Sequence, residues 1–176
     1  MAKSKTDFGA YIASYIDFPR SGILFRDISP LLASYEGMTR ATDEFVELLS
    51  CYQIDAVAGI ESRGFLFSTL LAMRLKVGSL MIRKPGKLPG DLAHKKYDLE
   101  YGSSELTVQK LATIENQNIL IVDDLLATGG TLAAAIELLV AQHANVVACA
   151  VVIELLALGG REKLARPIVA LESYND

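Results

Sequence analysis

Two adjacent carboxylates and a glycine-rich turn are the residues of this sequence best suited to chemistry. Asp123 and Asp124 follow the apolar run 118–122, and the turn 128–131 (TGGT) comes shortly after them. Glycine lets the backbone approach a ligand closely, and the free N–H groups at the start of a helix bind phosphate. Carboxylates accept hydrogen bonds from hydroxyl groups or hold a divalent cation. Phosphate donors and diol acceptors this close together predict a site for a ribose 5-phosphate group.

Paired acids after a strand also occur where no sugar phosphate binds. Two aspartates can simply cap a strand–turn–helix corner, and receiver domains and Walker-B strands carry similar pairs. The sequence has no G-x-x-x-x-G-K-[ST] motif and no G-x-G-x-x-G motif after a strand, which argues against a P-loop and a dinucleotide-binding turn. The TGGT turn beside the acids favours the phosphate site over a plain corner.

An arginine at the end of another predicted strand suits a second anionic group. Arg63 lies in the segment 61–64 (ESRG), between a predicted strand and a predicted helix. A guanidinium group and the N–H groups of a helix start both attract anions. A solvated arginine in a capping turn is the alternative, and the spacing alone does not separate the two.

The segment 83–97 (RKPGKLPGDLAHKKY) lacks any hydrophobic periodicity. It holds two prolines, two glycines and five Lys or Arg residues, and Arg83, Lys84 and Lys87 begin it. A structureless stretch of this length inside a compact domain is usually functional or disordered. We therefore expect a flexible loop that closes over a departing anion and excludes water, with a soluble connector as the alternative.

Hydrophobic periodicity predicts the elements that must position these residues. Apolar strands that alternate with helices indicate an α/β protein with a parallel sheet covered on both faces, and ligands collect at the carboxyl ends of such strands. We expect helices over 7–18, 37–52, 64–75 and 130–142, an irregular segment over 22–30, and strands over 56–60, 79–82, 118–122, 145–153 and 168–171.

Composition restricts the class of protein. The 176 residues carry a net charge of −4 and are 51% hydrophobic, which excludes a disordered chain and argues against a binder that covers nucleic acid with its whole surface. A local basic patch stays open, but we expect no nucleic-acid partner. The longest apolar run, 146–153, is too short for a membrane span. Cys51 and Cys149 are too few for a disulfide framework and are expected in the core. We expect one domain over 1–176, cytoplasmic and without membrane contact.

The segment ILIVDDLLATGGT resembles the phosphoribosyl pyrophosphate signature of the type I phosphoribosyltransferases. Four flanking segments and REKLA near the C-terminus resemble the adenine-specific members of that family: FRDISPLL (25–32), GIESRGFLF (59–67), IRKPGKLPG (82–90) and YDLEYGSSEL (97–106). The resemblance implies an open, mostly parallel sheet flanked by helices. It also implies a small base-binding hood from about residues 1–35, with 83–97 as the flexible catalytic loop.

The resemblance further implies an activity: transfer of ribose 5-phosphate from phosphoribosyl pyrophosphate to N9 of adenine, giving AMP and pyrophosphate. It implies Mg²⁺ bound through the donor, with Asp123 and Asp124 as its protein ligands, and a homodimer. Glu100 is expected to handle a purine proton, with Glu105 as second choice, and Arg63 and Lys84 to assist catalysis. The remaining roles are adenine binding by Phe25, Arg26 and Leu126, and donor binding by Arg63, Arg83, Lys84, Lys87, Asp123, Asp124, Ala127, Thr128, Gly129, Gly130 and Thr131.

Two other functions stay open at this point. A regulator could keep this fold to sense phosphoribosyl pyrophosphate or a purine without catalysis, although such proteins usually carry an additional nucleic-acid-binding segment. A transferase for a 6-oxo purine or for orotate would share the donor site and differ in the base site.

Overall fold

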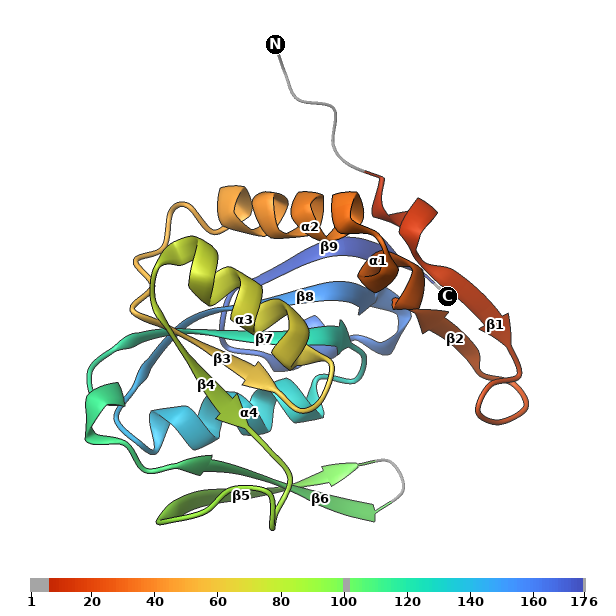
Figure 1. Ribbon diagram of the computed structural model, residues 1–176. Helices are drawn as coiled ribbons and strands as arrows, with labels where there is room; N and C mark the ends of the chain where they lie inside the picture. The colour runs from red at the N-terminus through yellow and green to blue at the C-terminus, as the bar shows by residue number, and fades with distance from the viewer. Residues whose placement is uncertain (1–6, 100–101, 176) are drawn as a thin grey trace.

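A five-stranded parallel sheet forms the centre of the molecule (Figure 1), which is described here by a computed structural model over residues 7–99 and 102–175. The three central strands are almost wholly buried, because helices cover both faces of the sheet. The predicted α/β sheet is therefore confirmed. In the order β4-β3-β7-β8-β9, the strands are β4 (Gly78–Ile82), β3 (Ala56–Ile60), β7 (Asn118–Leu126), β8 (Asn145–Leu155) and β9 (Ile168–Tyr174).

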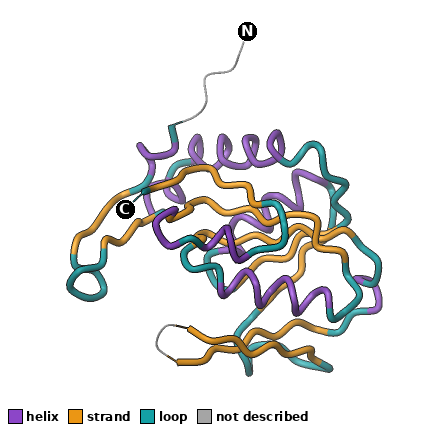
Figure 2. Tube along the Cα trace, turned by 180° about the vertical axis from the view of Figure 1, so that it is seen from behind, coloured by secondary structure: helices purple, strands orange, loops and turns teal. Residues whose placement is uncertain are grey.

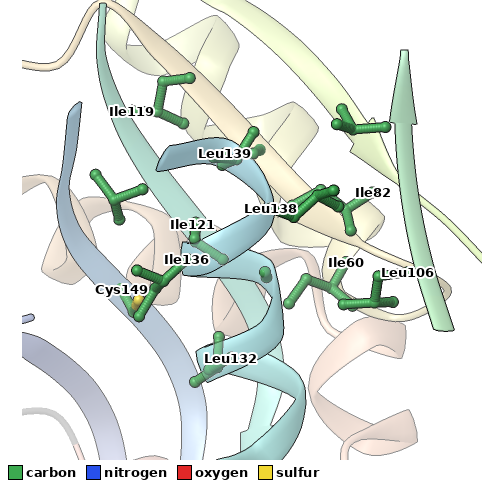
Figure 3. Close-up of a cluster of buried hydrophobic side chains, with 14 of the residues drawn as sticks. Ile60, Ile82, Leu106, Ile119, Ile121, Leu132, Ile136, Leu138, Leu139 and Cys149 are labelled. Carbon is green, nitrogen blue, oxygen red and sulfur yellow. The ribbon is translucent and has the colours of Figure 1, made fainter. Parts of the chain in front are cut away.

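Helices lie on the two faces of the sheet (Figures 1 and 2). On one face the short α1 (Ser29–Ala33) leads into α2 (Tyr35–Leu48), and α2 packs beside α3 (Gly64–Leu75). On the other face lies α4 (Gly130–Val140), whose buried side chains pack against β7, β8 and the strand that carries Leu106 (Figure 3). Within the described residues, four 3₁₀ helices complete the order: Phe8–Tyr11, Ala112–Ile114, Leu156–Leu158 and Gly160–Lys163.

The N-terminal region corrects the helix predicted over 7–18. Only Phe8–Tyr11 is helical, as a 3₁₀ turn, and Ala13–Ile16 forms β1. β1 pairs antiparallel with β2 (Leu24–Asp27), which lies inside the segment 22–30 expected to be irregular. Aromatic and β-branched residues favour strands, and here the pairing of the two segments overrides a helical spacing.

The prediction that residues 83–97 form a structureless segment is also partly wrong. Its irregular part ends before β5 (Leu92–Leu99), which pairs antiparallel with β6 (Gly102–Gln109), a strand that the sequence pattern did not predict. Burial alternates along β5, with Ala93 inside and His94 outside, but lysines and a histidine obscure this period in the sequence. The hairpin packs on the outer side of α4.

Other features differ less from expectation. β3 and α3 have the predicted bounds, whereas β7 continues through the two aspartates to Leu126. Cys149 is buried as expected, but Cys51 is exposed just after α2. Among the described residues, no helix is long and apolar enough to cross a bilayer.

The strand order places a crevice in the middle of the sheet. From β3 the chain proceeds outward to β4, and from β7 it proceeds in the opposite direction to β8 and β9. The connections that leave the carboxyl ends of β3 and β7 therefore go in opposite directions, and open parallel sheets bind ligands at such a switch point.

Candidate functional site

The crevice between β3 and β7 contains a cavity of about 210 Å³. Arg63, from the turn that joins β3 to α3, lines it on one side, and residues 123–132 line the rest. The structure thus brings together the arginine, the paired acids and the TGGT turn, which the sequence patterns had indicated separately.

The TGGT turn forms the start of α4. Gly129 precedes the helix with φ +84°, a left-handed conformation that glycine adopts without strain. No side chain in the described part of the chain caps this helix. The first N–H groups of α4 are therefore available to an anion, and the helix dipole favours negative charge there.

Asp123 and Asp124 are buried within β7, with exposures of 9% and 7%. The Asp124 N–H donates a hydrogen bond to Asp123 Oδ1 at 2.9 Å. Burial raises the pKa of both carboxyls, and the neighbouring Asp124 charge raises that of Asp123 further. Two carboxyls held this close are therefore costly to ionise together unless positive charge lies beside them.

Arg63 supplies part of that positive charge. Its Nη2 lies 2.8 Å from Asp124 Oδ2, and the guanidinium lowers the pKa of that carboxyl against the larger effect of burial. The adjoining Gly64 permits this approach, because a Cβ there would lie 2.6 Å from the Val122 carbonyl oxygen. α3 therefore starts directly against β7 at Val122 and Asp123.

Of the basic residues after β4, Arg83 is bound to other groups of the protein, whereas the side chains of Lys84 and Lys87 are exposed. Arg83 Nε donates to Glu61 Oε2 at 2.8 Å, and Nη1 donates to the Lys87 carbonyl at 3.2 Å. Glu61 also accepts a hydrogen bond from the Lys84 N–H at 3.2 Å. Arg83 is thus already bound within the protein, whereas the Lys84 and Lys87 side chains are exposed.

The N-terminal hairpin approaches the crevice through Phe25. The Arg63 guanidinium carbon lies 5.8 Å from the centre of the Phe25 ring, and the Phe18 ring packs on Phe25 at 5.0 Å. The Arg26 side chain turns away to other partners: it donates to Ser14 Oγ at 2.6 Å and stacks on the Tyr174 ring at 3.9 Å. Of Arg26, the backbone rather than the guanidinium is therefore placed for recognition.

Three further predicted residues have different outcomes. Glu100 lies outside the described residues. Glu105 lies on β6 and is paired with His94, whose Nδ1 is 2.9 Å from its Oε1. Leu126 lines the cavity but is 1% exposed and belongs to the core, whereas the half-buried Leu125 lines the same cavity. Leu125 is thus the better placed of the two for a flat ligand.

Several contacts around the TGGT turn were not predicted from the sequence. Tyr97 Oη lies 3.4 Å from Thr131 Oγ1, and Lys95 pairs with Glu137 of α4, so β5 is bound to the helix that begins at the TGGT turn. Glu154 at the end of β8 pairs with Arg161. The charge that ends the apolar run 145–153 was the one sequence feature that could have indicated this pair.

The described residues contain no group of three or more His, Cys, Asp or Glu side chains that could hold a metal ion. Within the crevice, the adjacent Asp123 and Asp124 carboxylates are the groups that suit a cation. Two carboxylate ligands fit Mg²⁺, which usually binds through one or two carboxylates and substrate phosphates.

Comparisons with known proteins agree with this geometry. Residues 29–169 match the model of the phosphoribosyl transferase domain. The adenine phosphoribosyltransferase of Gluconobacter oxydans is 50% identical over 170 residues, which cover 97% of this chain and 95% of that protein.

Solved structures give the same result. The adenine phosphoribosyltransferase of Thermoanaerobacter pseudethanolicus has a TM-score of 0.91 at 39% identity, covering 95% of this chain and 98% of that one. The Saccharomyces cerevisiae enzyme, crystallised with an imino-altritol bisphosphate and adenine, has a TM-score of 0.88 at 40% identity, covering 93% and 96%. Because these matches extend over nearly the whole chain in both sequence and fold, the chain belongs to the phosphoribosyltransferase family, in its adenine phosphoribosyltransferase branch.

Proposed function

We propose that this protein transfers ribose 5-phosphate from phosphoribosyl pyrophosphate to N9 of adenine, releasing AMP and pyrophosphate. The observation that carries the proposal is the cavity at the switch point, where a buried carboxylate pair lies beside an uncapped helix start. The relatives named above support adenine as the base.

The donor fits this cavity by charge and by hydrogen bonding. The N–H groups of residues 127–131 would bind the 5′-phosphate, and the Thr128 and Thr131 hydroxyls would add donors. Asp123 and Asp124 would accept hydrogen bonds from the two ribose hydroxyls. The raised pKa of the pair is the expected property of carboxylates that await donors or a cation.

Arg63 would stabilise the pyrophosphate as it leaves. A guanidinium has five N–H donors, so the contact with Asp124 leaves others for an anion. The exposed Lys84 and Lys87 would add positive charge from the irregular segment before β5, whereas Arg83 would first have to leave Glu61. Stabilisation of charge by groups already in place needs no covalent nucleophile.

Mg²⁺ is the proposed cofactor, held chiefly by the donor's own oxygens with Asp123 and Asp124 as protein ligands. When bound, it would neutralise negative charge that develops on pyrophosphate. The cytoplasmic location expected from the sequence stays a prediction.

The base would lie between Arg63 and the backbone of β2. β2 pairs only with β1 in the described structure, so its other edge can offer N–H and C=O groups near Phe25 and Arg26. A donor and an acceptor set for a 6-amino group would leave unpaired buried groups against a 6-oxo purine. This is the physical basis for selecting adenine.

We also propose a homodimer that forms through the helical face. A groove of about 510 Å³ between α2 and α3 is lined by Met38, Leu70 and other residues, and its rim includes Tyr35 at 88% and Met73 at 76% exposure. Exposed apolar groups gathered in this way mark an interaction surface. A second copy of the chain is the proposed partner, because the resemblance to this family implies a dimer.

A panel of bases tests the proposed reaction. With phosphoribosyl pyrophosphate and Mg²⁺, we expect pyrophosphate release with adenine and at least about a hundredfold less with hypoxanthine, guanine or orotate. Release with a 6-oxo purine or orotate would reassign the base. If the protein binds phosphoribosyl pyrophosphate but releases no pyrophosphate with any base, the result would favour a regulator that senses the donor without catalysis.

Replacement of Asp123 by Asn tests the state of the acid pair. An unfolded chain ionises this carboxyl near pH 4, whereas the folded protein has a raised pKa, so ionisation costs the folded state stability as the pH rises. Urea unfolding from about pH 4 to 8 should show Asp123→Asn gaining stability relative to the parent as the pH rises. The same variant should bind the donor more weakly.

An exposed aspartate provides the control for that experiment. Asp91→Asn changes a side chain that is 76% exposed and lies outside the cavity. A stability difference between Asp123→Asn and the parent that stays constant, or that falls with rising pH, would show that burial does not govern the Asp123 carboxyl.

Two glutamine variants separate the candidates for proton handling. Glu100→Gln should lower kcat by about tenfold to a thousandfold, in line with general acid–base catalysis. Glu105→Gln should retain nearly the parent kcat, because the Glu105 carboxylate is already in contact with the His94 ring. Steady-state rates at saturating substrates check this. A larger loss of kcat in Glu105→Gln than in Glu100→Gln would assign the proton handling to Glu105 instead.

Sedimentation equilibrium tests the dimer. We expect a species of twice the 19.1 kDa chain mass and a shift to monomer in Met73→Glu, which places a charge on the rim of the groove. Leu48→Glu, at the far end of α2 with 44% exposure, is the matched control and should remain dimeric. A monomeric parent protein, or equal dissociation of both variants, would refute the proposed interface.

A further inference from the structure

The turn 159–160 packs directly on the backbone of the phosphate-binding turn. A Cβ on Gly160 would lie 2.1 Å from the Ala127 carbonyl oxygen and 2.9 Å from the Gly129 nitrogen. A Cβ on Gly129 would in turn lie 2.6 Å from the Gly160 carbonyl oxygen. Backbone meets backbone here with no space for a methyl group, so a shift of one turn must shift the other.

An ion pair between the half-exposed Arg161 and the buried Glu154 fixes the position of this second turn. Arg161, next to Gly160, donates from Nε to Glu154 Oε1 at 2.8 Å and from Nη2 to Glu154 Oε2. Its Nη1 donates to the Ile168 carbonyl at 2.8 Å, where β9 begins. The guanidinium therefore joins the turn to the ends of two strands.

Glu154 is itself tied to the phosphate site through the sheet. It is 2% exposed and pairs in register with Leu126, the residue immediately before Ala127. Glu154 thus links β7, at the point where the phosphate-binding turn leaves it, with the turn that packs on top. Neither Glu154 nor Arg161 lines the cavity.

We propose that Glu154 and Arg161 are positioning residues that set the conformation of residues 127–129 through Gly160, and so control affinity for the 5′-phosphate of the donor. The inference rests on the proposed function, because it takes the TGGT turn as the phosphate site.

A purely structural role makes a different prediction. An ion pair whose arginine is 46% exposed contributes little to stability, because solvent screens it. The three hydrogen bonds of Arg161 fix direction as well as distance, which apolar contacts do not. Their loss should therefore change phosphate affinity even in a variant that stays folded.

Gly160→Ala is the most direct test, with ribose 5-phosphate as the titrant in calorimetry. The added methyl group must displace the Ala127 carbonyl, so we expect the Kd to rise about ten- to a hundredfold. Gly78→Ala is the matched control, because a Cβ there meets no atom within 4 Å, and its Kd should stay within about twofold of the parent value.

Arg161→Lys provides a second and milder test. Lysine keeps the charge but cannot make the two bonds to Glu154 and the bond to Ile168 together. We expect the Kd for ribose 5-phosphate to rise about three- to thirtyfold and the KM for adenine to stay within about twofold. Circular dichroism selects the folded variants, and Arg161→Lys decides the matter if Gly160→Ala does not fold.

The outcomes separate this inference from the proposed function. A parent protein that does not bind ribose 5-phosphate would refute the phosphate site itself. Binding by the parent with an unchanged Kd in folded Gly160→Ala or folded Arg161→Lys would overturn the positioning role alone. An equal rise in the Kd for ribose 5-phosphate and the KM for adenine would indicate general loss of structure, and would also overturn it.

Discussion

Two buried carboxylates at the end of β7 impose the constraint on which the rest of this structure depends. Burial alone would drive Asp123 and Asp124 toward the neutral form, and the Arg63 charge, which lowers the pKa of both carboxyls, offsets this only in part. Such a pair costs the folded protein stability until hydroxyl donors or a cation arrive. This cost is reduced at the switch point, because α3 and α4 both begin there and their dipoles add positive potential.

Local sequence patterns determine much of this fold. The apolar run of β3 and the periodicity of α3 predicted the correct bounds because each pattern is complete within its own segment. The two antiparallel hairpins were not predicted, because they form through pairing between strands and not from a pattern within one strand. In β5, the charged residues also obscure the alternation of buried and exposed side chains. For the same reason β7 was predicted too short: acids that would end an exposed strand continue a central one.

In the site, too, features within one segment could be predicted from the sequence, whereas contacts between distant segments could not. Asp123, Asp124 and the TGGT turn are neighbours in the chain, so their spacing alone predicted a phosphate and diol site. The contacts that arrange them join residues far apart in sequence: Arg63 with Asp124, Arg83 with Glu61, and Gly160 with Ala127. No pattern within one segment could have predicted these contacts, which depend on the order of strands in the sheet.

We expect one nucleoside monophosphate to occupy this crevice in a single orientation. A crystal structure of the protein with AMP tests it most directly. The account predicts the 5′-phosphate at the N–H groups of residues 127–131, the ribose hydroxyls on Asp123 and Asp124, and the base beside Phe25. A nucleotide bound elsewhere, or one with its phosphate at Arg63 and its ribose away from the aspartates, would contradict it.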